Sequence, residues 1–196
     1  MTTLIPPEPT GASEPAHHGH NLTGMVIFLC SESVIFLAFF VGYAVLKSSS
    51  PVWLPAGVEG LEVREPLRNT IILVSSSFVA WFAEIQLRRG NLWGFRALWV
   101  LTMAMGSFFV FGQAVEWRGL AFSLGDGVFG GCFYLLTGFH GLHVITGVLL
   151  MALMLARSFR AGNYNGGEAG VASVSLFWHF VDVIWILLFL LLYIWR

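Results

Sequence analysis

Long apolar segments alternate with short polar ones along most of the chain. Five of these segments come near or exceed the ~20 residues that an α-helix needs to cross a bilayer. They cover about residues 22–46, 69–87, 97–115, 128–156 and 171–195. The pattern predicts an all-α membrane protein, in which residues 21–196 form one domain, a bundle of five transmembrane helices.

The first 20 residues differ from the rest of the chain. They hold four of the seven prolines and lack a long apolar run, which predicts a flexible N-terminal tail over residues 1–20. A histidine cluster in this tail, His17, His18 and His20, is interpreted as part of a solvated segment rather than as a metal site.

The composition agrees with a bilayer environment. The chain is 57% hydrophobic and 11% charged with a mean hydropathy of +0.77, whereas about a quarter of residues are charged in a soluble domain. The formal net charge is −1 and the basic residues are scattered, so the basic surface that nucleic-acid binding needs is missing. These residues divide evenly between the two sides of the predicted membrane, and the positive-inside rule leaves the orientation open.

Ionisable side chains interrupt three of the apolar segments, where such groups are neutral or face the bundle interior. At ~1.5 Å per residue, Glu32 lies roughly 15 Å into the membrane, with His179 and Asp182 roughly 12 and 16 Å from the same face. His143 and His140 lie roughly 20 and 24 Å from that face. The similar depths, and the spacing of three within each of the pairs His140/His143 and His179/Asp182, predict one buried polar layer of five residues.

The residue types leave three interpretations of this layer open. Imidazole and carboxyl groups can form an interhelical clasp through hydrogen bonds. Acids and histidines at this depth also mark proton or ion paths. Haem ligation by His143 and His179 is the third interpretation, although the Glu-x-x-His pattern of di-iron bundles is absent. On balance we predict no catalytic residue and no metal ligand in this chain.

Several motifs resemble one family in its own order along the chain. They are CSESVIFLAFF around Glu32, EPLRNTIILVSSS from Glu65, QAVEW from Gln113, SLGDGVFG from Ser123, TGFHGLHVITG over 137–147, GGEAG from Gly166 and SLFWHFVDVIW over 175–185. Together they resemble haem-copper oxidase subunit III. The shorter length makes the chain most similar to the bacterial five-helix cytochrome c oxidase subunit III, which lacks the first two helices of the seven-helix members.

The resemblance implies a non-redox accessory subunit of a respiratory oxidase that reduces oxygen to water. Its main partner would be subunit I, followed by subunit II, with haem and copper in these partners and none in this chain. Members of the family sustain proton uptake by the catalytic subunit, protect it during turnover and bind phospholipid. Subunit III of a quinol oxidase and an independent proton or ion channel are the alternative functions.

The resemblance also assigns expectations to particular residues. Glu32 matches a buried acid of the family that reacts with carbodiimide, and Arg157 matches an arginine that contacts a lipid phosphate, a role that suits a guanidinium at a helix end. The implied location is a bacterial energy-transducing membrane, either the inner membrane or an internal one. The N-terminus would be cytoplasmic and the C-terminus external.

Overall fold

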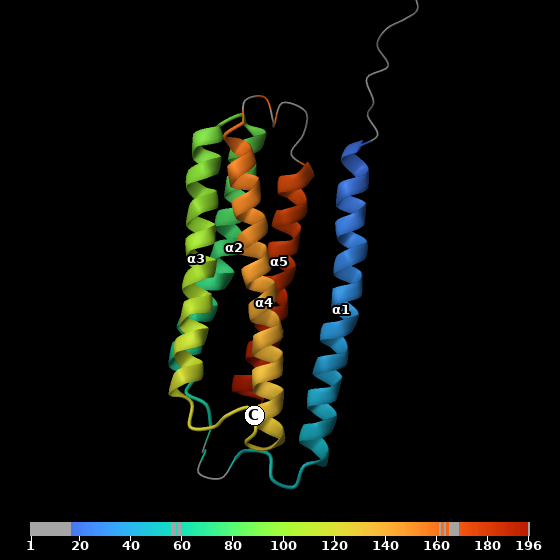
Figure 1. Ribbon diagram of the computed structural model, residues 1–196, viewed down its shortest axis with the longest axis vertical. Coiled ribbons are helices and arrows are strands. Elements are labelled where there is room, and N and C mark those ends of the chain that lie inside the picture. Colours follow the sequence, from blue (N-terminus) through green and yellow to red (C-terminus); the bar gives the residue numbers. More distant parts are fainter. Residues whose placement is uncertain are drawn as a thin grey trace, which may run out of the picture.

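The structure, a computed structural model, describes residues 17–55, 58, 60–160, 162, 164 and 169–195. In these ranges the chain forms five long α-helices and a closing π-helical turn (Figure 1). The elements are α1 (His17–Ser49), α2 (Arg64–Arg88), α3 (Leu92–Gly119), α4 (Gly127–Ser158), α5 (Ala169–Phe189) and η1 (Leu190–Ile194). Each of the five helices is long and apolar enough to cross a membrane, so the all-α fold with five transmembrane helices is confirmed.

Several helices extend beyond the predicted apolar segments, because polar residues at helix ends lower the hydropathy without preventing helix formation. α2 begins at Arg64 with Pro66 in its first turn, where proline removes no intrahelical hydrogen bond. α3 begins at Leu92, and the Asn91 side chain caps it by accepting from the Gly94 N–H at 3.0 Å. α1 begins at His17, inside the predicted tail; residues 1–16 lie outside the described ranges.

The end of α1 and the end of the last helix meet on the side of the bundle opposite the start of α1. The last helix widens into the π-helical turn η1, where the Trp195 N–H donates to the Leu190 carbonyl at 2.8 Å. The Lys47 ammonium at the end of α1 donates to the Trp195 carbonyl and lies 4.2 Å from the centre of the Trp195 indole ring. This contact joins the C-terminal ends of α1 and α5.

The helices differ strongly in how much of their surface is covered. In Figure 1, α2 to α5 stand side by side and α1 lies at one edge, where it contacts α5 and α4. In the most apolar 18-residue stretch of α5, 56% of the residues are buried, whereas in that of α1 only 11% are. α5 is therefore the centre of the bundle, and most of α1 faces outward, where lipid or a partner subunit has to cover its apolar side chains.

Large aromatic side chains fill the core around α5. Trp99, Trp178 and Trp185 are at most 1% exposed. Two glycines on facing helices make room for the Trp178 indole: Gly106 of α3 and Gly147 of α4, where an added Cβ would lie 2.7 Å from an indole carbon of Trp178. The close approach that Gly147 permits is therefore between a helix backbone and a side chain of α5.

Candidate functional site: polar groups inside the bundle

Glu32 of α1 and His143 of α4 form a direct contact across the bundle. Glu32 Oε2 lies 3.1 Å from His143 Nε2, and the two side chains are 15% and 13% exposed. The other imidazole nitrogen, His143 Nδ1, lies 2.8 Å from the Phe139 carbonyl oxygen. Since one imidazole nitrogen is held by its own helix, the ring presents the other nitrogen to α1 in a fixed direction.

These contacts determine how many protons the pair holds. A carbonyl oxygen only accepts, so His143 Nδ1 must carry a hydrogen and donate to Phe139. The contact between Glu32 and Nε2 then needs one further proton, either on the carboxyl group or on Nε2. Both arrangements are neutral overall, a neutral carboxylic acid beside a neutral imidazole or a carboxylate beside an imidazolium. A proton can therefore move between the two groups without changing the net charge buried in the membrane.

Aromatic rings surround this pair on the bundle side. The Phe36 ring of α1 lies 5.2 Å from the His143 ring, and Phe139 and Phe177 lie at 4.9 and 6.2 Å, measured between ring centres. Few polar atoms are available to stabilise a charge among these rings. The low local polarity strengthens the hydrogen bond between Glu32 and His143 and raises the cost of breaking it.

A second polar group joins α2 to α5 through the hydroxyl of Ser77. This hydroxyl donates to the Asp182 carboxyl group and accepts from His179 Nδ1 at 2.9 Å. Ser175 of α5 lies 3.4 Å from the other nitrogen of His179. His179 and Asp182 thus share one helix face, as their spacing predicts, but their link passes through a serine that the sequence reasoning did not select.

Two further hydroxyls of α2 hold the indole groups of α5. Ser76 accepts from Trp178 Nε1 at 2.9 Å, and Thr70 accepts from Trp185 Nε1 at 2.9 Å. Each hydroxyl donates its own hydrogen to a carbonyl one turn earlier in α2. The sequence analysis missed these contacts, although the spacing of seven between Trp178 and Trp185 places both indole groups on one face of α5.

His140 stands apart from both groups. It is fully buried, its ring lies 4.9 Å from Trp185 and 5.8 Å from Phe109, and neither ring nitrogen has a hydrogen-bond partner among the described residues. The five residues expected in one layer therefore fall into separate groups: Glu32 with His143, His179 with Asp182 through Ser77, and His140 alone. Within the described residues, no group of three or more His, Cys, Asp or Glu side chains is placed to hold a metal ion.

Glu116 forms a polar group just beyond the predicted apolar segment 97–115. Because α3 continues to Gly119, Glu116 lies within the helix rather than after its end. Its Oε1 accepts from the Tyr193 hydroxyl at 2.7 Å and its Oε2 accepts from Gln113 Nε2 at 3.1 Å. The carboxyl group therefore ties α3 to the π-helical end of the chain.

Arg157 lies in the last turn of α4, at the end of the bundle where α1 begins and α2 ends. Its side chain is exposed. The neighbouring Ser158 is held by Arg96 of α3, whose Nε donates to the serine hydroxyl at 3.1 Å. Arg157 thus lies at a helix end that the contact between Arg96 and Ser158 ties to α3.

Together, the five spans and the small hydrogen-bonded groups between them define a polytopic membrane protein with polar contacts between its helices. Comparisons with known proteins narrow this class. A family model described as cytochrome c oxidase subunit III matches residues 11–196. The chain belongs to this family.

Curated relatives are similar to this chain along nearly its whole length. Cytochrome c oxidase subunit 3 of Thermostichus vulcanus is 42% identical over 193 residues, covering 95% of this chain and 96% of the relative. The protein of the same name from Synechocystis sp. is 44% identical over 182 residues, covering 91% and 78%. That from Lumbricus terrestris is 40% identical over 196 residues, covering 91% and 73%. The chain is thus a subunit of an oxidoreductase complex, and its partners are other oxidase subunits.

Proposed function

We propose that this subunit supports proton supply to the catalytic subunit of a respiratory cytochrome c oxidase and stabilises that subunit during turnover. The observation that carries the proposal is the contact between Glu32 and His143. The pair holds one proton that can reside on either group, and both side chains keep a small exposed fraction. A group with these properties can exchange protons with its surroundings at low electrostatic cost.

The surroundings of the pair support a role at a subunit boundary. Glu32 lies on α1, the helix with the least buried surface, so a neighbouring subunit could approach this side of the bundle. In our proposal subunit I is the main contact and subunit II a further one, and these partners carry the haem and copper. The N-terminus is then cytoplasmic and the C-terminus external, in the inner or an internal membrane of a bacterium.

Lipid binding is the second part of the proposal. Arg157 is an exposed residue at the end of α4, and phosphate oxygens are favourable acceptors for the paired N–H donors of a guanidinium. We assign to it a contact with the phosphate of a bound phospholipid. Arg157→Gln in the assembled oxidase should lower the amount of copurifying phospholipid, measured by mass spectrometry of lipid extracts. Equal lipid retention in the variant and in Arg160→Gln, a matched control close by in the sequence, would contradict this assignment.

The proton role is tested by Glu32→Gln in the assembled oxidase. Glutamine keeps the size of the side chain but cannot pass a proton to His143. We expect oxygen-reduction turnover to fall by about fivefold, the equivalent of ~1 kcal/mol. The loss should be greater at alkaline pH, where protons are scarce, and inactivation during turnover should be faster. The readouts are oxygen consumption against pH and the activity remaining after repeated turnover.

A matched control separates this effect from general damage. Glu84 of α2 is also a largely buried acid, paired with Arg88 at 2.8 Å, and Glu84→Gln should leave the pH profile unchanged. Identical pH profiles for Glu32→Gln and the unmodified oxidase would rule out the proton role.

The choice of electron donor and the channel alternative need their own measurements. The relatives named above are subunits of cytochrome c oxidases, which supports cytochrome c as the donor of the complex. Activity of the copurified complex with cytochrome c, and little with quinol, is the expected result. The reverse result would favour a quinol oxidase. Proton flux by the purified chain alone in liposomes would favour an independent channel.

A further inference from the structure

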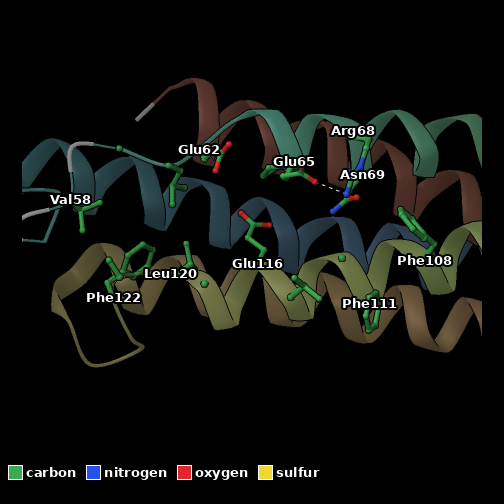
Figure 2. A pocket seen from close by; sticks show the side chains of 17 residues that line it. Val58, Glu62, Glu65, Arg68, Asn69, Phe108, Phe111, Glu116, Leu120 and Phe122 are labelled. Atoms are coloured by element: carbon green, nitrogen blue, oxygen red, sulfur yellow. Dashed lines mark ion pairs between the residues drawn. The ribbon is translucent and has the colours of Figure 1, made fainter.

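A cavity of about 500 Å³ opens between the start of α2 and the end of α3 (Figure 2). It lies at the opposite side of the membrane from Arg157, since α2 begins and α4 ends at opposite ends of the bundle (Figure 1). This volume is in the range of small-molecule sites. The side chains that define its chemistry are Glu62, Glu65, Asn69, Phe108, Phe111 and Glu116.

Carboxyl groups outnumber basic groups in the polar part of this cavity. Among the described residues, three carboxyl groups line it, from Glu62, Glu65 and Glu116, together with the guanidinium of Arg68. Arg68 is already paired with Glu65 at 2.5 Å. Figure 2 shows Glu116 of α3 facing the wall that carries Glu62 and Glu65. The start of α2 and the end of α3 contribute helix-end charges of opposite sign that largely offset each other, so the carboxyl groups favour a cation.

Glu116 is fixed in the orientation that a ligand would require. Tyr193 and Gln113 each donate one hydrogen bond to a different carboxyl oxygen, which leaves further acceptor positions on both oxygens. Both donors are neutral, and among the described residues no arginine or lysine pairs with Glu116. A cation in the cavity would supply the missing positive charge.

Asn69 provides an independent indication of a ligand. Its side chain is 4% exposed and lines the cavity, yet its Oδ1 has no hydrogen-bond partner among the described residues. Buried amide oxygens without a partner are rare, because leaving one unpaired costs about 1–3 kcal/mol. The Asn69 amide rests against Gly112 of α3. A Cβ added to Gly112 would lie only 2.9 Å from Cγ of Asn69. Asn69 is thus held in place as an acceptor.

The remaining wall of the cavity is apolar and open toward the lipid. Phe108, Phe111 and Val115 are 43%, 66% and 49% exposed, and they lie on the part of α3 that runs deeper into the membrane. A ligand that fills the whole cavity therefore needs a hydrocarbon chain below its polar group. A cation with an attached hydrocarbon chain matches both the carboxyl groups and the apolar wall.

We propose that this cavity binds the ammonium headgroup of a membrane amphiphile. The ammonium group donates to Glu116 and Asn69, with Glu62 at the entrance, and the attached chain lies along Phe108 and Phe111. An ammonium carries three donors and no acceptor, which matches a site built from acceptors. The inference is independent of the role of Glu32 and of the lipid contact at Arg157.

The test uses dodecylammonium with a photoreactive diazirine in its chain, added to the assembled oxidase in neutral-lipid nanodiscs. We expect cross-links to peptides that cover residues 58–69 and 108–122. Glu116→Gln should reduce this labelling by about fivefold or more, the loss expected for one charge-assisted hydrogen bond. Glu84→Gln, which changes a carboxyl group at the other end of α2, should label like the unmodified protein.

A second variant guards against misfolding of Glu116→Gln. Gly119 lines the cavity, and a Cβ added there meets no atom within 4 Å. Gly119→Phe should fill the entrance without disturbing the bonds to Glu116, and should also abolish the labelling. Equal labelling by an uncharged dodecanol probe, undiminished labelling in both variants, or no labelling of the assembled oxidase would overturn the proposal.

Competition identifies the source of the ammonium group. Nanodiscs that contain phosphatidylethanolamine should suppress the labelling more strongly than nanodiscs with phosphatidylglycerol if the natural ligand is a lipid headgroup. Suppression by a soluble alkylamine alone, with no difference between the two lipids, would assign the site to a free amine. Both results support the ammonium site, and the turnover assays of Glu32→Gln report on the proposed function separately.

Discussion

Gly147→Ala is expected to destabilise the folded chain by about 1–3 kcal/mol, the usual cost of adding atoms to a well-packed core. The new Cβ would lie 2.7 and 2.8 Å from two carbons of the Trp178 indole and 3.4 Å from a carbon of Phe177. Trp178 cannot easily move away. Its Nε1 is bonded to Ser76, its ring is fully buried, and Gly106 confines it from α3.

Gly141→Ala is the matched control for this variant. Gly141 lies in the same helix, and a Cβ added there meets no atom within 4 Å. Alanine favours helix by up to about 1 kcal/mol over glycine, so this change should be neutral or slightly stabilising. Thermal unfolding of the purified chain in detergent measures both variants. Equal melting temperatures for the two would show that Trp178 is not confined as described.

Ser77→Ala is expected to lower the free energy of unfolding by about 1–3 kcal/mol, the cost of leaving buried polar partners unsatisfied. The Ser77 hydroxyl is both the donor to Asp182 and the acceptor for His179. Asp182 is 3% exposed, and its Oδ1 already lacks a partner among the described residues. Removing the hydroxyl therefore leaves both groups without their link to α2 and loosens the contact between α2 and α5.

Ser48→Ala provides the comparison, because Ser48 is exposed and bonds only to the Ala44 carbonyl of its own helix among the described residues. We expect it to change stability by less than about 0.5 kcal/mol. The double variant Ser77→Ala with Asp182→Leu should recover part of the loss, since the donor Ser77 and its acceptor Asp182 are then removed together and only His179 still lacks its partner. The measurement is again thermal unfolding, and a Ser77→Ala protein as stable as the Ser48→Ala protein would exclude a stabilising role for the Ser77 link.

The helices could be predicted from sequence because a bilayer demands about 20 apolar residues for each span. The ends of the helices could not be predicted in this way. Pro66 in the first turn of α2 and Asn91 at the cap of α3 act as single residues, and a hydropathy average over many residues does not detect them. For the same reason the third predicted segment ends at residue 115, although Glu116 still lies within α3 and bonds to Tyr193. The family could also be recognised from motifs alone.

The sequence by itself determined the depth of the buried ionisable residues and their order along each helix. Which side chains meet was decided only by the tertiary structure. The spacing of three residues fixes the depth of His140 and His143 along α4 and the angle of about 60° between them around the helix axis. It does not fix which helix lies opposite each of them. Because α1 packs beside α4 on one side and α5 fills the centre, His143 meets Glu32 whereas His140 lies against Trp185. Lateral helix order and rotation thus divided the predicted layer into separate groups.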